Sequence, residues 1–113
     1  MQGGPDYRFV SFAAAEALVQ RGELVQLLLL PTMFGGSADP RNVVLVPPFV
    51  VEEKARIDGN IVAPLVGAGA VRRYTARPRY QGESVVPIAI VITASDPEQF
   101  TAIIKIWGDA LEE

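Results

Sequence analysis

Arginines and tyrosines gather in one short stretch of the chain, residues 72–80. This stretch holds four of the ten basic residues, and no acidic residue lies between Asp58 and Glu83. Guanidinium groups bind phosphates in a fork geometry, so a stripe of them could grip a nucleic-acid backbone. Arginine and tyrosine can also support RNA cleavage without histidine. The nucleic-acid-binding candidates are Arg72, Arg73, Arg77 and Arg79, and the catalytic candidates are Arg73, Arg77, Arg79, Tyr74 and Glu83.

A continuous strand through this stretch separates the two residue types. Side chains alternate between the two faces of a strand, so Arg73, Arg77 and Arg79 share one face, while Tyr74 and Tyr80 lie on the other. The same alternation is typical of a half-solvated edge strand, whose outward charges resist aggregation. Both interpretations, a phosphate-binding face and a solvated edge, remain open.

A glycine-rich loop at residues 34–42 is the second candidate for chemistry. Its landmarks are Phe34, Gly35, Gly36 and Asn42. The loop lacks the lysine of a Walker motif and the glycine spacing of a dinucleotide-binding loop. By itself, the pattern is typical of a surface turn between two strands.

The order of short motifs along the chain resembles the bacterial DNA/RNA non-specific endonuclease domains. These are ββα-metal nucleases, often found at the C-termini of secreted or contact-delivered toxins. The resemblance covers about residues 27 to 94. It rests on Phe34-Gly35-Gly36, Asn42 leading to Val46-Pro47, then Val71, Pro78-Arg79-Tyr80-Gln81-Gly82 and Pro87-Ile88.

The residues that would carry the family's chemistry are missing. Family members have a Gly-His pair shortly before Phe-Gly-Gly, and its histidine activates water; here the stretch is Leu27-Leu28-Leu29-Leu30. The family's metal-binding asparagine follows the Val-Pro step, but residues 48–56 contain none. Glu52 or Glu53 could stand in the place of a supporting acid, or simply solvate a helix face. Loss of a general base typically slows the reaction by a factor of about 10² to 10⁴.

We therefore expect a catalytically degenerate nuclease-like domain that acts by binding, as part of a bacterial toxin or a toxin–immunity system. One alternative is a histidine-free ribonuclease-type toxin that uses the cluster from Arg72 to Arg79. The other is a structural or oligomerisation domain with no small-molecule site, pairing through a sheet edge or a C-terminal helix stripe. The expected partner is a protein, either a second copy or a cognate toxin or immunity partner, and nucleic acid remains possible through the arginines.

Composition narrows the chemistry further. The chain has 113 residues, a formal net charge of -3, and neither histidine nor cysteine, which excludes imidazole bases, thiol nucleophiles and thiolate metal sites. We expect no metal and no cofactor. The sequence shows neither a signal peptide nor an apolar run long enough to cross a membrane, so we expect a cytoplasmic protein or one exported within a larger protein.

The elements that must position these residues are those of one α+β domain over residues 1–113, with residues 1–6 flexible. We expect a small, mostly antiparallel sheet of about four to five strands with two to four helices packed on it. Strands are predicted at residues 7–10, 24–30 (the central strand) and 42–46, with a hairpin of residues 71–80 and 84–94 joined by Gln81, Gly82 and Glu83.

Helix signals occur in three places. Ser11 can cap a helix that starts at Phe12 and ends before Gly22. Residues 49–68 have helical spacing, but Gly59 and Pro64 predict a kink or two short helices. Asp96, Pro97 and Gln99 form a capping box ahead of an amphipathic C-terminal helix. Its apolar stripe would be Phe100, Ile103, Ile104, Trp107 and Leu111.

Overall fold

Residues 7–112 are described by a computed structural model, and the expectation that residues 1–6 are flexible lies outside this range. The helices and strands follow one another as α1 (Phe12–Gln20), β1 (Val25–Leu28), β2 (Val43–Val46), α2 (Pro48–Ile57), α3 (Ala63–Gly67), β3 (Val71–Arg79), β4 (Ala89–Pro97) and β5 (Gln99–Lys105). The α+β class is confirmed. The single predicted sheet is instead two antiparallel sheets, β1–β2 and β3–β4–β5.

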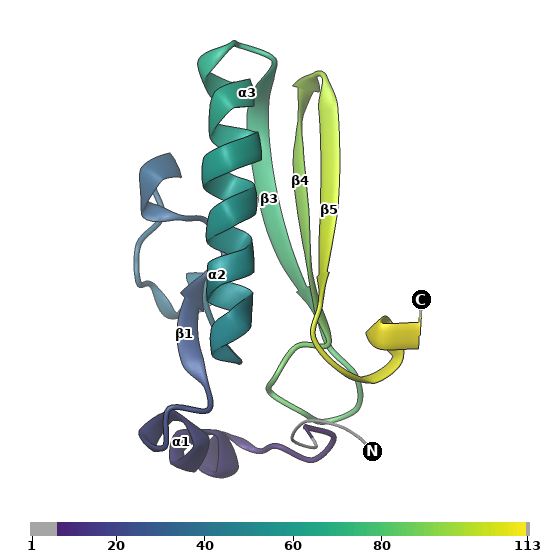
Figure 1. The fold of residues 1–113 in the computed structure, drawn as a ribbon. Coiled ribbons are helices and arrows are strands. Elements are labelled where there is room, and N and C mark those ends of the chain that lie inside the picture. Colours follow the sequence, from purple (N-terminus) through teal and green to yellow (C-terminus); the bar gives the residue numbers. More distant parts are fainter. Residues whose placement is uncertain (1–6, 113) are drawn as a thin grey trace.

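The helical column formed by α2 and α3 lies between the β1 hairpin and the three-stranded sheet (Figure 1). The column contributes the buried side chains Val50, Ile57 and Val62 to the core. The central strand β4 contributes Ile90 and Ile92, which are both 0% exposed. Burial of these branched side chains fixes which face of β4 points toward the helices, because a shift by one residue would expose all of them.

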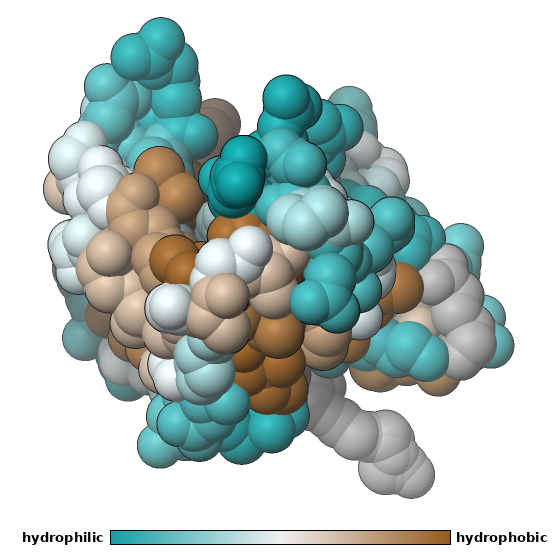
Figure 2. Space-filling view, turned by 90° about the horizontal axis from the view of Figure 1, so that it is seen from above, coloured by the Kyte–Doolittle hydropathy of each residue, from teal (hydrophilic) through white to brown (hydrophobic). Residues whose placement is uncertain are grey.

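The expected break within residues 49–68 is replaced by a wider helical turn. A π-helical turn, Asp58–Val62, joins α2 to α3, and the N–H of Ala63 donates to Asp58 O five residues earlier. Such a turn re-routes the hydrogen bonds next to Pro64, which has no N–H to give, so the column continues. The column ends in α3 at the end of the molecule from which Figure 2 is seen, and apolar residues appear at the surface in that view. Val66 of α3 is 44% exposed. Within residues 7–112, no helix is long and apolar enough to cross a membrane.

The N-terminal helix is confirmed at both ends. The Oγ of Ser11 accepts from the N–H of Ala14 at 3.2 Å, and Gly22 has a φ of 76° after the last turn. Only Ala15 of this helix is fully buried, and Phe12 is 77% exposed. The predicted strand at residues 7–10 is wrong. A turn is present there, in which the N–H of Val10 donates to Tyr7 O at 3.4 Å, and the carbonyl of Val10 accepts from Val85 in a distant loop at 3.0 Å.

The predicted C-terminal helix is wrong. Residues 99–105 form β5, and Asp96, with a φ of 70°, is the last but one residue of β4. The segment from Thr101 to Ile106, both ends included, contains four β-branched residues. Such side chains favour a strand, and this strand pairs with β4. This pairing outweighs the local capping box. Trp107 is buried, and its Nε1 donates to Val86 O at 3.0 Å, so it offers no helix stripe to a partner.

The predicted hairpin has a longer connection than the sequence suggested. β3 and β4 pair with the register Tyr74↔Ala94 and Ala76↔Ile92, but residues 80–88 form a loop in place of a three-residue turn. The loop is held by its own contacts, since Ile88 donates to Arg79 O at 2.7 Å and accepts from Ile106 at 2.7 Å. Likewise, β1 is not a central strand: it pairs with β2 alone, although β2 itself is confirmed.

Two glycines should respond oppositely to alanine. A Cβ at Gly36 would lie 1.7 Å from the carbonyl oxygen of Leu30, so Gly36→Ala must displace the backbone and should lower the free energy of unfolding by about 1–3 kcal/mol. Gly59 in the helical column has open space, and Gly59→Ala should raise that free energy by up to about 1 kcal/mol. Urea denaturation of both variants tests the pair, and a neutral Gly36→Ala would show that this loop is not packed as described.

Candidate functional site

A buried ion pair lies on the inner face of α2 and the π-helical turn. Lys54 Nζ is 2.6 Å from Asp58 Oδ2, and the side chains are 2% and 3% exposed. They are four residues apart, so they lie one above the other on the same side of the helix. Charged groups are almost never this buried unless they are paired. The pair is therefore the first place to look for chemistry.

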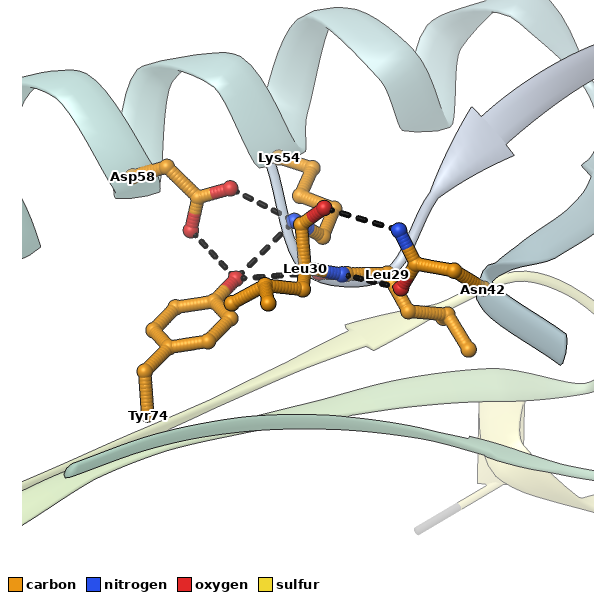
Figure 3. A network of polar contacts seen from close by, with 6 residues as sticks. All are labelled: Leu29, Leu30, Asn42, Lys54, Asp58 and Tyr74. Atoms are coloured by element: carbon orange, nitrogen blue, oxygen red, sulfur yellow. Dashed lines mark hydrogen bonds and ion pairs between the residues drawn. The ribbon is translucent and has the colours of Figure 1, made fainter. Parts of the chain in front are cut away.

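Tyr74 of β3 completes the network (Figure 3). Its hydroxyl donates to Asp58 Oδ1 at 2.7 Å and accepts from Lys54 Nζ at 2.9 Å. The same oxygen lies 3.5 Å from the carbonyl of Leu29, at the end of β1. Helix, sheet and hairpin therefore meet at one hydroxyl group. Across the described residues, no buried side-chain nitrogen or oxygen lacks a hydrogen-bond partner.

Burial changes the acid–base properties of this network. Desolvation lowers the pKa of Lys54, and the hydrogen bond and charge of Asp58 act in the opposite direction. Desolvation raises the pKa of Tyr74, and the hydrogen bond to the Asp58 carboxylate raises it further. The phenol therefore stays protonated and serves as a donor. An amine whose charge is matched by a neighbouring carboxylate is a poor nucleophile.

The glycine loop is organised by Asn42. Asn42 Oδ1 accepts from the N–H of Leu30 at 2.8 Å, and Nδ2 donates to the carbonyls of Leu30 and Ser37 at 3.0 and 2.9 Å. Phe34 of the same loop packs against the ring of Tyr74, with 5.2 Å between ring centroids. The landmarks Phe34, Gly36 and Asn42 thus hold a loop against the network, and Gly35 supplies a turn with a φ of 95°.

A hollow of about 280 Å³ opens beside the ion pair, between β1 and α2. Its walls include Leu28, Met33 and Val51, with Lys54 and Asp58 also among the lining residues. The walls are mainly apolar, and the two charges in them already satisfy each other. The hollow can accept an apolar group but presents no free base.

Leu28 and the two candidate glutamates lie apart. Leu28 lines the hollow, whereas Glu53 forms an ion pair with Arg56 at the surface and Glu52 is exposed. Asn42 is engaged in its loop. Between residues 7 and 112, no group of three or more His, Cys, Asp or Glu side chains is placed to hold a metal ion. The acidic residues therefore do not assemble a metal centre.

Arg73, Arg77 and Arg79 lie on the opposite face of the three-stranded sheet from Tyr74. β3 alternates as the sequence predicts: Arg73 and Arg77 are exposed, and Tyr74 and Ala76 point toward the helices. Arg79 follows on the arginine side and is half-buried. Arg72 is exposed at the start of the strand, and Glu83 is exposed in the loop after it. The five catalytic candidates are thus not brought to one place.

Sequence reasoning missed Lys54 and Asp58. The available signal was helical spacing, since Val50, Lys54 and Ile57 recur on one face of α2 and all three are buried. A charged residue within an apolar stripe, followed four residues later by its counter-charge, predicts a buried pair. The contribution of Tyr74 required knowledge of how β3 packs on α2, which no local pattern contains.

The network predicts a specific pattern of stability changes. Lys54→Met leaves the Asp58 carboxylate buried without its cation and should lower the free energy of unfolding by about 3–5 kcal/mol. The double variant Lys54→Met/Asp58→Leu removes both charges and should lose less than either single variant. Glu53→Gln, which breaks an exposed pair on the same helix, should change little. Denaturant titration of Lys54→Met, Asp58→Leu, the double variant and Glu53→Gln measures these changes, and additive losses in the double variant would argue against the pair.

Comparison of the chain with protein-family models, curated proteins and solved structures gives no match. The observations that bear on function are therefore the buried network, the hollow beside it, and the arginine face of the sheet.

Proposed function

We propose that this chain is a catalytically degenerate nuclease-like domain that acts by binding, as part of a bacterial toxin or a toxin–immunity system. The observation that carries the proposal is the composition of the hollow between β1 and α2. Leu28 belongs to the stretch Leu27-Leu28-Leu29-Leu30, where the resemblance expects the general base, and Val51 belongs to the segment where it expects the metal-binding asparagine; both residues line the hollow. A β-hairpin followed by a helix is the arrangement that the ββα name describes, and here its interior is apolar and charge-compensated.

The buried network supports the same conclusion. Lys54 donates to both Asp58 and Tyr74, and Asp58 accepts from both. An effective base needs a free lone pair within reach of substrate. The network offers none, because both oxygens of Asp58 accept hydrogen bonds and Lys54 Nζ donates to Asp58 and to Tyr74. Its role in this proposal is to hold the hairpin, helix and sheet together.

The surface that favours nucleic acid as a ligand is the outer face of the sheet. Arg73, Arg77 and Arg79 repeat along β3, and alternate residues of a strand are about 6.8 Å apart. Exposed threonines lie on the same face, including Thr75 and, across the sheet, Thr101. This basic and hydroxyl-rich face suits phosphate contacts. The ribonuclease alternative has weaker support, because Tyr74 lies on the other face.

A plasmid assay tests the loss of chemistry. With magnesium present, the purified chain should leave supercoiled DNA and structured RNA intact, because base and metal ligand are both missing. Leu28→His should not restore cleavage, since it supplies only the base. Magnesium-dependent cleavage that is abolished by chelation, at a rate typical of a ββα-metal nuclease, would refute the proposal.

A binding assay tests the arginine face. The triple variant Arg73→Gln/Arg77→Gln/Arg79→Gln should bind single-stranded RNA more weakly in fluorescence anisotropy at low salt. The slope of log affinity against log salt should fall by about 2, which is the loss of three phosphate contacts. The matched control Arg21→Gln/Arg41→Gln/Arg56→Gln removes the same charge elsewhere. Equal losses in the two triples would indicate a general charge effect and remove the assigned face.

A further inference from the structure

The two edges of the three-stranded sheet are unequal. β3 and β5 are the edge strands in the order β3–β4–β5. β3 carries Pro78, which has no N–H, and several arginines, and these are the devices that protect a sheet edge. β5 has no proline, and its one charged residue, Lys105, is at its end. An open edge of this kind is a template for another strand.

The position of Pro78 shows which residues of β5 face outward. Because Pro78 cannot donate to β4, its neighbours Arg77 and Arg79 form the ladder, opposite Val91 and Ala89. The main-chain N–H and C=O groups of successive β4 residues point alternately toward β3 and toward β5. Ile90 and Ile92 therefore hydrogen-bond to β5, where their partners are Ile104 and Ala102. The N–H of Ile106, which donates to Ile88 O at 2.7 Å, follows the same alternation.

Thr101 and Ile103 therefore direct their main-chain N–H and C=O groups away from the sheet. Thr101 is exposed, and Ile103 is 46% exposed. No other strand of the described chain pairs with this side of β5. An extended backbone can pair with these groups, because a strand presents donors and acceptors at the matching spacing.

A groove runs beside this edge, between β5 and α2. It has a volume of about 620 Å³, and its apolar lining residues are Phe49, Ile103 and Ile104. Phe49 is 50% exposed and begins a helical stripe that continues through Glu52, Glu53 and Arg56. An aromatic ring entering from the sheet edge would cover the apolar part of the groove.

We propose that a second copy of this chain pairs with β5, antiparallel and centred on Ala102, to form a continuous six-stranded sheet. The register that overlaps all seven residues of β5 places Ala102 opposite Ala102, Thr101 opposite Ile103, and Gln99 opposite Lys105. Thr101 and Ile103 form the hydrogen-bonded pairs, and no like charges face each other. Antiparallel pairing across a two-fold axis keeps α2 of both copies on the same side of the sheet.

The same register supplies an occupant for the groove. Phe100 of the second copy lies opposite Ile104, on the side of the sheet that faces α2. Its ring enters beside Ile104 and packs toward Phe49. Phe100 is half-buried in the single chain, so pairing would bury its remaining surface together with that of Phe49. This inference is independent of the proposed loss of nuclease chemistry.

Cysteine crosslinking tests the pairing and its register. The chain has no cysteine, so Ala102→Cys introduces a single thiol. In the proposed register, the two Cα atoms of this non-hydrogen-bonded pair are about 4.5 Å apart, within disulfide range. Mild oxidation should give a covalent dimer, reversed by a reductant. Thr75→Cys, which is exposed on the other edge strand, is the matched control and should give no covalent dimer. Equal crosslinking of both variants would overturn the proposed register.

Light scattering after size exclusion tests the association itself. The unmodified chain should give a mass that rises toward twice 12.2 kDa with concentration. Ile103→Lys places a charge at the edge and should raise the dimer Kd by about tenfold or more, with an unchanged circular dichroism spectrum. A monomeric mass for the unmodified chain at every concentration would overturn the proposal, as would an undiminished dimer in Ile103→Lys.

Discussion

The arrangement of this molecule depends on the solvation of two charges. Removing an ammonium and a carboxylate from water costs several kcal/mol per ion, and only close pairing with additional hydrogen bonds offsets that cost. Lys54 bonds to Oδ2 of Asp58 on the helix, and the other carboxylate oxygen, Oδ1, accepts from Tyr74 of β3. The sheet must therefore approach the helix at one particular place and register. The loop that begins after Leu29 then closes over the same hydroxyl.

In a frame built in this way, the residues that hold the elements together need not be the residues that carry out chemistry. The hairpin, the helix and the glycine loop can be kept by packing and by main-chain hydrogen bonds, as Asn42 and Gly36 show, whatever lines the space between them. A fold can therefore persist after its catalytic groups are replaced, and function must be argued from the residues that remain. Here the remaining exposed features are the arginine face of the sheet and the β5 edge.

Local signals in the sequence predicted the correct element where no pairing with a distant segment competed with them. Ser11 and Gly22 bound α1, the Val-Pro step ends β2, and the arginines alternate along β3 as expected. The signals failed where pairing over distance decided the outcome. Asp96, Pro97 and Gln99 read as a helix start, but β-branched residues beyond them pair with β4 instead. The contact of Tyr74 with Lys54 was not predicted, because the two residues lie 20 positions apart in the sequence. The division into two sheets likewise depends on packing against α2, which no single segment encodes.

Pro78 has a consequence for the size of any assembly. A sheet with two open edges can recruit strands at both ends and grow into a filament, because each added copy exposes a fresh edge. In this chain, one edge is interrupted by a residue that cannot donate and by flanking arginines that repel their own kind. Joining two copies through β5 leaves only such edges outward. Self-association through β5 therefore stops at two copies, because the edge that carries Pro78 does not pair further.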